Sequence, residues 1–142
     1  MSTKFSVTID AADPYELGKF WELALGYVRE APPPPHETWE ETLTAWGLPQ
    51  ERWNDANALV DPDGLGPRIF LQKVPEAKTT KNRIHLDVRV SASAREKDRA
   101  SMQAKTDELV AAGATLVRVF DEQFTGHWIV LQDPEGNEFC IV

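Results

Sequence analysis

Residues 133–140 read Asp-Pro-Glu-Gly-Asn-Glu-Phe-Cys, and this stretch decides the fold. Its first four residues are typical of a tight turn, because Asp starts the turn, Pro fixes the next φ and Gly supplies the left-handed position. The same Asp-Pro-acid-Gly pattern occurs at residues 61–64. Both turns lie between short runs with the alternation of β-strands. The two turns therefore indicate an internal repeat.

Each half of the chain is predicted to run strand, helix, glycine and then three strands, with the turn before the last strand. In the first half we expect these elements at 5–9, 13–25, 27–29, 58–60 and 68–74. In the second half we expect them at 83–90, 93–112, 115–120, 128–131 and 138–142. A unit of roughly 60 to 75 residues with one helix buries little surface alone, so two copies should share one core.

We predict one domain spanning 1–142, with module 1 at about 1–78 and module 2 at about 79–142. Module 1 carries a helical excursion at 32–57. Within it, Trp39 and Trp46 are seven residues apart and share one helix face, which must be covered. The face either packs on the sheet or walls a cleft with aromatic surface suited to a planar ligand.

Charge and cysteine content narrow the class of protein. The 142 residues include 15 Lys+Arg against 23 Asp+Glu, for a net charge of -8. This balance argues against binding to nucleic acid or to an anionic membrane, and weakly favours a cationic or neutral ligand. Cys140 is the only cysteine, so no internal disulfide can form, and no apolar run approaches the ~20 residues of a membrane span. We therefore expect a cytoplasmic protein.

Three segments carry a resemblance to a known superfamily. They are Asp13-Pro14 before Phe20-Trp21-Glu22-Leu23-Ala24-Leu25-Gly26-Tyr27, then Arg83-Ile84-His85-Leu86-Asp87-Val88, then Asp133-Pro134-Glu135-Gly136-Asn137-Glu138-Phe139. With these motifs in this order, the chain resembles the vicinal oxygen chelate superfamily, which includes glyoxalase I, bleomycin-resistance proteins, methylmalonyl-CoA epimerase and extradiol dioxygenases. Residues 60–68 and 81–83 resemble more narrowly its glyoxalase-like group. The resemblance implies an α+β fold in which two βαβββ modules pair into a curled mixed sheet around one cleft.

The resemblance also implies positions for a metal, on the first and last strand of each module. They fall on Ser6, Gln72, His85 and Cys140, with Gln72 chosen by side-chain alternation. Ser6 is a poor ligand for a divalent metal, and Cys140 favours zinc over harder ions. The expected cofactor is therefore either none or a divalent metal, and a metal-dependent glyoxalase or dioxygenase is a lesser alternative.

His85 and Asp87 are the leading catalytic candidates, because two residues apart on a strand they share a face. An imidazole beside a carboxylate can act as a general base, although the same pair also occurs as a plain hydrogen-bonded contact. Glu138 shares its strand face with Cys140 and is a candidate acid partner or a strand-edge charge. Four further residues complete the predicted ligand-binding set with Trp39, and these are Ser6, Gln72, His127 and Trp128.

The expected function is binding of a small oxygenated or aromatic metabolite, with a lyase- or isomerase-type proton transfer if the protein is an enzyme. The alternative is a non-catalytic protein that sequesters a drug or metabolite, as the bleomycin-resistance branch does. A homodimer is expected. A fold of this kind hosts many chemistries, so the reaction itself does not follow from it.

Overall fold

The computed structural model describes all residues, 1–142, and the chain divides into two compact units, Met1–Glu76 and Ala77–Val142. None of the α-helices combines the length and the hydropathy needed to cross a bilayer.

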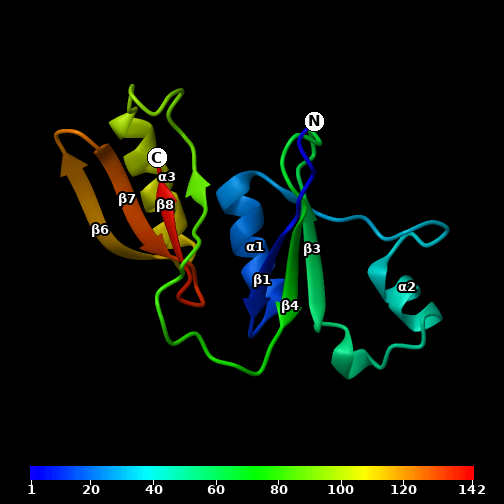
Figure 1. Cartoon of the computed structure of the whole chain (residues 1–142). Helices are drawn as coiled ribbons and strands as arrows, with labels where there is room; N and C mark the ends of the chain where they lie inside the picture. The colour runs from blue at the N-terminus through cyan, green and yellow to red at the C-terminus, as the bar shows by residue number, and fades with distance from the viewer. The chain divides into compact units, whose positions relative to one another are not determined.

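Unit 1 is a mixed four-stranded sheet with strand order β1-β4-β3-β2 and one helix, α1, against it. Its elements are β1 (Val7–Ala11), α1 (Pro14–Leu25), β2 (Val28–Arg29), α2 (Trp39–Ala45), a short 3-10 helix (Gln50–Arg52), β3 (Ala56–Val60) and β4 (Ile69–Lys73). Strands β1 and β4 are parallel, and the other neighbouring pairs are antiparallel. In Figure 1 the segment that carries α2 leaves this sheet between β2 and β3.

Helix α1 begins and ends as its sequence predicts. Asp13 accepts a hydrogen bond from the Glu16 amide, Pro14 occupies the first turn, and Gly26 closes the helix with a φ of 69°. The helix approaches the sheet closely at Gly18, where an added Cβ would collide with the Asn57 amide. A side chain at position 18 would therefore have to displace Asn57 or the helix.

Unit 2 repeats this plan. Its elements are β5 (Asp87–Val88), α3 (Arg99–Ala111), β6 (Thr115–Glu122), β7 (Gly126–Gln132) and β8 (Glu138–Ile141), with strand order β5-β8-β7-β6. Strands β5 and β8 are parallel, whereas β6–β7 and β7–β8 are antiparallel. Figure 1 shows α3 lying against one face of this sheet.

The core of unit 2 lies between α3 and that face. Ile129, Leu131, Phe139 and Ile141 are almost completely buried, as are Met102 and Leu109 from the helix. Successive residues of a strand point to opposite faces of the sheet, so Trp128, Val130 and Cys140 lie on the other face, outside this core. We call that opposite face, which points away from α3, the open face of unit 2.

The repeat and the fold class predicted from sequence are confirmed. Both units have βαβββ order and a mixed sheet, and the two sheets are not closed into a barrel. Both Asp-Pro-acid-Gly turns form as expected, since Gly64 and Gly136 donate to the carbonyls of Asp61 and Asp133 with positive φ. The pairing of the units around one cleft, and their union in a single domain, stay predictions.

Two element boundaries in unit 2 differ from the sequence prediction. The expected strand 83–90 is reduced to β5, and Ile84, expected on the apolar face, is 85% exposed. The ladder with β8 starts only where the Cys140 amide donates to the Leu86 carbonyl. The expected helix 93–112 begins instead at Arg99, because Asp98 accepts from the Ser101 amide and so caps the helix there.

Candidate functional site

The strand register of unit 2 aligns one residue from each strand in a row across the open face. Asp87 on β5 pairs with Cys140 on β8, Cys140 pairs with Val130 on β7, and Val130 pairs with Arg118 on β6. Alternation places His85 on the same face, two residues before Asp87. Asp87 on β5 and His85 just before it therefore share a face with Cys140 and Arg118.

His85, Asp87 and Cys140 form a cluster whose potential ligand atoms all lie within 4.8 Å of one another. The His85 Nε2 atom is 3.5 Å from Asp87 Oδ1, slightly beyond a good hydrogen bond. Both side chains are nearly half-exposed, at 42% and 48%, whereas Cys140 is buried. The structure thus brings together three of the residues singled out in the sequence, with the imidazole and the carboxylate accessible to a ligand.

Cys140 is a neutral thiol in this setting. Burial, with a smaller contribution from the negative charge of Asp87, raises its pKa to about 11. A thiol with so high a pKa is a poor nucleophile at neutral pH. It becomes a good ligand only where a metal ion displaces its proton.

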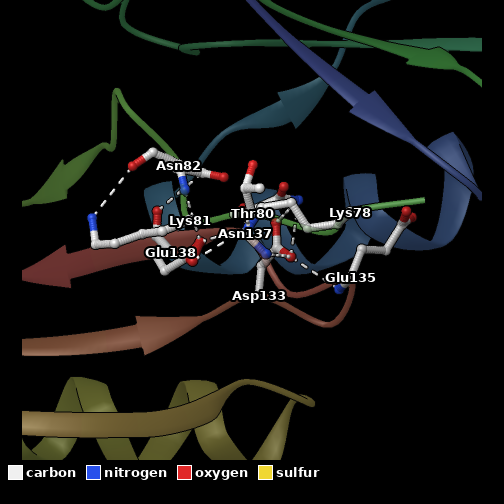
Figure 2. A network of polar contacts seen from close by, with 8 residues as sticks. All are labelled: Lys78, Thr80, Lys81, Asn82, Asp133, Glu135, Asn137 and Glu138. Carbon is white, nitrogen blue, oxygen red and sulfur yellow. Dashed lines mark hydrogen bonds and ion pairs between the residues drawn. The ribbon is translucent and has the colours of Figure 1, made fainter. Parts of the chain in front are cut away.

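Glu138, the third catalytic candidate, is held in an ion pair. Its carboxylate accepts from Lys78 Nζ at 3.0 and 3.3 Å and from the Asn82 amide at 3.4 Å (Figure 2). Burial disfavours ionisation of Glu138, but these hydrogen bonds outweigh it and hold its pKa below the usual value. The side chain is therefore suited to remain a carboxylate that anchors the segment before β5, and poorly suited to donate a proton.

Asp133 stabilises the turn that leads into β8. Its buried carboxylate accepts from the Glu135 amide at 2.9 Å and from both the amide and the side chain of Asn137 (Figure 2). The Lys78–Glu138 pair adjoins this turn in the same view. Together they fix both strands, β5 and β8, that carry the cluster.

An aromatic pair also lies on the open face. Phe120 on β6 and Trp128 on β7 face each other across the strands and stack with centroids 4.7 Å apart and planes 6° from parallel. The Arg118 guanidinium is 4.5 Å from the Phe120 ring centroid. No acidic side chain pairs with Arg118, in contrast to Arg52, Arg68 and Arg99.

His127 and Trp128, predicted as neighbours in ligand binding, project to opposite faces of β7. His127 faces the α3 side, where its Nδ1 atom is buried without a hydrogen-bond partner and lies 3.9 Å from Asp121 Oδ1. Asp121 is itself bound twice by Arg99 of α3. The structure thus brings Trp128, but not His127, to the face of the cluster.

The corresponding face of unit 1, away from α1, carries different residues. If Ser6 corresponds to His85 and Thr8 to Asp87, the parallel register places Phe70 opposite Thr8, where unit 2 has Cys140. Gln72, which alternation suggested for that place, lies opposite Asp10 and donates to its carboxylate at 2.8 Å. Ser6 is four residues from Asp10, so the structure does not bring Ser6 and Gln72 together.

Unit 1 nevertheless repeats the arrangement of an arginine over a phenylalanine. The Arg68 guanidinium is 5.4 Å from the Phe70 ring centroid. Here the guanidinium is taken by Glu30 through two hydrogen bonds of 2.8 Å, which raise the pKa of Arg68 and lower that of Glu30. Its cation is therefore already neutralised within the unit.

Trp39 is the first residue of α2 and Trp46 is its C-cap, and the prediction that the face they share is covered is wrong for Trp46. The Trp39 indole donates to the Glu30 carbonyl and contacts Trp46 edge to face, with centroids 6.3 Å apart. Trp46 remains 63% exposed. Trp39 is therefore held within unit 1 by a backbone contact, and its predicted role in ligand binding stays a prediction.

The sequence reading missed Arg118 and Phe120. Both lie within the predicted strand 115–120, but no local signal distinguishes them. Phe120 becomes informative only when the β6–β7 register sets it opposite Trp128. The position of the turn between β6 and β7, had it been predicted, would have given that register.

Comparison with known proteins identifies the family. The sequence matches the model of the glyoxalase-like domain over residues 6–142, so the chain belongs to the glyoxalase-like family within the vicinal oxygen chelate superfamily. A search of curated proteins found no match.

Several solved structures share the fold at low sequence identity. A glyoxalase/bleomycin resistance protein/dioxygenase family enzyme from Burkholderia phytofirmans superposes with a TM-score of 0.64 at 17% identity, over 96% of this chain and 94% of its own. FosX from Listeria monocytogenes, a fosfomycin resistance protein solved with Mn(II), gives 0.65 at 10% identity, over 99% and 89%. TioX from Micromonospora gives 0.53 at 17%, over 99% and 97%.

Proposed function

We propose that this protein binds a small oxygenated metabolite on the open face of unit 2 and catalyses a proton transfer of the lyase or isomerase type. The observation that carries the proposal is the accessible His85–Asp87 pair, 3.5 Å apart, on the same face of the sheet as a stacked aromatic pair. Family membership supports a small-molecule function but leaves the reaction open.

In this proposal His85 is the base. Imidazole exchanges protons near neutral pH, and a carboxylate at one ring nitrogen favours the tautomer that leaves the other nitrogen free to accept a proton. Asp87 is placed to do this at Nε2, and it also stabilises the imidazolium that forms. The proton accepted comes from an acidic C–H or O–H of the ligand. His85 then returns it to another atom of the ligand or to a leaving group.

Glu138 supports the proposal as a positioning residue. Its contacts with Lys78 and Asn82 hold the segment that leads into β5, on which His85 and Asp87 lie. It is not assigned the role of a proton donor, because those contacts favour its charged form.

The experiment is hydrogen exchange of candidate ligands in D2O, followed by proton NMR. We expect a panel of α-hydroxy, α-keto and phenolic compounds to contain members whose acidic C–H exchanges faster with the protein than without it. His85→Ala should abolish this acceleration and retain binding. Exchange that proceeds equally in His85→Ala would contradict the assignment of the base. Binding without exchange in any compound would favour a sequestering protein.

A second candidate, a metal-dependent function, is favoured by the cluster of His85, Asp87 and Cys140. One imidazole, one carboxylate and one thiol form a donor set suited to zinc, and less suited to the Mn(II) held by FosX from Listeria. A zinc ion bound there would polarise a ligand oxygen as a Lewis acid. Titration with zinc should then give one bound ion per chain, and Cys140→Ser should weaken binding at least tenfold. A tight site that is insensitive to Cys140→Ser would exclude this donor set.

A further inference from the structure

The chemical class of the ligand follows from the free cation on the open face. We infer that this face selects a flat carboxylate, whose conjugated plane stacks beside Phe120 and Trp128 and whose carboxylate binds the guanidinium of Arg118. The inference rests on the proposed function and specifies the ligand class of that same face. It departs from the net charge of -8, which by itself favours a cationic or neutral ligand.

Two arginines, one in each unit, differ in whether an acidic side chain binds them. Arg68 and Arg118 each lie over a phenylalanine of their sheet, at 5.4 and 4.5 Å. Arg68 is saturated by two hydrogen bonds to Glu30, whereas Arg118 has no acidic partner. A guanidinium presents a planar fork that matches a carboxylate. The guanidinium of Arg118 is therefore available to bind the carboxylate of a ligand, whereas the guanidinium of Arg68 is already bound to the carboxylate of Glu30.

A flat surface lies beside that cation. Two rings with planes 6° from parallel form a stacked platform, and a further conjugated plane gains by stacking against it. Phe120 and Trp128 are only partly buried. A saturated ring of similar size cannot make this contact.

The strand registers set the spacing between Arg118 and Asp87, the carboxylate that lies beside the proposed base His85. Arg118, Val130, Cys140 and Asp87 lie on four successive strands in one row, so Arg118 is about 14 Å from Asp87 between backbones at ~4.8 Å per strand. The side chains at the two ends of this row and a hydrogen bond of ~3 Å from each to the ligand take up part of that distance. The remaining length fits roughly one ring. The ligand class is therefore an aromatic carboxylate whose reactive group lies at the far end of the ring from the carboxylate.

The test is isothermal titration calorimetry with three probes of matched size. The probes are 4-hydroxybenzoate, its neutral amide 4-hydroxybenzamide, and the non-planar trans-4-hydroxycyclohexanecarboxylate. We expect 4-hydroxybenzoate to bind at least tenfold more tightly than either of the others, because one loses the charged hydrogen bonds and the other the stacking. Equal affinity for the amide, or no detectable binding of 4-hydroxybenzoate, would overturn the inference.

Variants assign the selectivity to residues. Arg118→Gln should weaken 4-hydroxybenzoate at least tenfold and leave the amide within twofold, whereas Arg68→Gln should change neither by more than twofold. Trp128→Leu should remove the preference for the planar carboxylate, with Phe120→Leu as the substitute if Trp128→Leu does not fold. Binding that is unaffected by Arg118→Gln would sink the inference while leaving His85-dependent exchange intact. Arg118-dependent binding without exchange would instead refute only the proposed chemistry.

Discussion

The two units have the same order of strands and helix, but they carry different side chains on the sheet face that points away from the helix. On the face away from its helix, unit 1 presents Ser6, Thr8 and Phe70. The guanidinium of its Arg68 is hydrogen-bonded to Glu30. Unit 2 presents His85, Asp87 and Cys140 at corresponding positions and leaves Arg118 unpaired. The shared order of elements is set by turns, helix caps and apolar alternation, which both units retain. The chemistry is set by a few outward-facing residues, which can change without affecting the core.

The largest expected effect concerns the proposed base and its counterpart. His85→Ala should reduce ligand proton exchange by at least about 100-fold, the usual scale for loss of a general base. Ser6→Ala, the corresponding change in unit 1, should alter exchange less than about twofold, because a serine there supplies no base. Proton NMR in D2O measures both variants against the wild type. A comparable loss in Ser6→Ala would show that unit 1 takes part in the chemistry.

Cys140 occupies the place in unit 2 that Phe70 occupies in unit 1, so only unit 2 has a thiol there. As the only thiol, Cys140 reports its own ionisation through its rate of alkylation by iodoacetamide. With a pKa of about 11, the native thiol should react roughly 100-fold more slowly at pH 8 than the unfolded chain does. The rate should rise through a midpoint near that pKa when followed by mass spectrometry.

The same pKa predicts how alkali affects stability. Because the folded-state pKa lies above the unfolded one, the thiol of the unfolded chain loses its proton first. The contribution of Cys140 to the free energy of unfolding should therefore fall as the pH rises between the two values. A native alkylation midpoint below pH 9 would contradict the buried, neutral thiol.

These contrasts also show what the sequence can and cannot predict. The two Asp-Pro-acid-Gly turns and the span of helix α1 are local features, and each was predicted correctly, whereas alternation extended the strand at 83–90 too far, where Ile84 is exposed. Local alternation also placed His85 beside Asp87. The same alternation is sufficient to place His127 and Trp128 on opposite faces of the sheet, since adjacent strand residues point to opposite faces.

The remaining features depend on pairing between distant strands. Arg118 joins the row of Asp87 and Cys140 only through the registers of three strand pairs. In module 1, the two extra residues between the turn and the strand shifted the expected position to Gln72, where the register has Phe70. The start of α3 was misplaced because several polar residues before Arg99 resemble a solvated helix, and the cap at Asp98 decides the boundary.

A stability contrast follows from the close approach in unit 1. Gly18→Ala should lower the free energy of unfolding by about 1–3 kcal/mol, because the new methyl group displaces Asn57 or the helix. Lys19→Ala on the same helix removes an exposed ion pair with Glu16 and a cation–π contact with Tyr15, and should lower the free energy of unfolding less than Gly18→Ala does. Urea unfolding measures both. An equal change in the free energy of unfolding for both variants would mean that α1 can shift to accommodate the new methyl group without loss of stability.

The smallest expected effect is that of the ion pair before β5. Lys78→Met should lower the free energy of unfolding by about 1 kcal/mol at neutral pH, since the pair with Glu138 is partly buried. The pKa of Glu138 is lowered in the folded state, so this stabilisation is present above the unfolded pKa and disappears as the pH falls through the folded one. Urea unfolding across an acidic pH series should show the two proteins converging. A constant difference at every pH would assign the effect to packing.

The central claim is that the open face of unit 2 is where a ligand binds. It is tested most directly by mapping amide chemical shifts of the labelled protein on addition of 4-hydroxybenzoate. We predict the largest changes at residues 85–87, 118–120, 128–130 and 140, with small changes at the corresponding residues 6–8 and 68–72. Equal or larger changes in the unit 1 set, or changes in neither set at saturating ligand, would contradict this assignment.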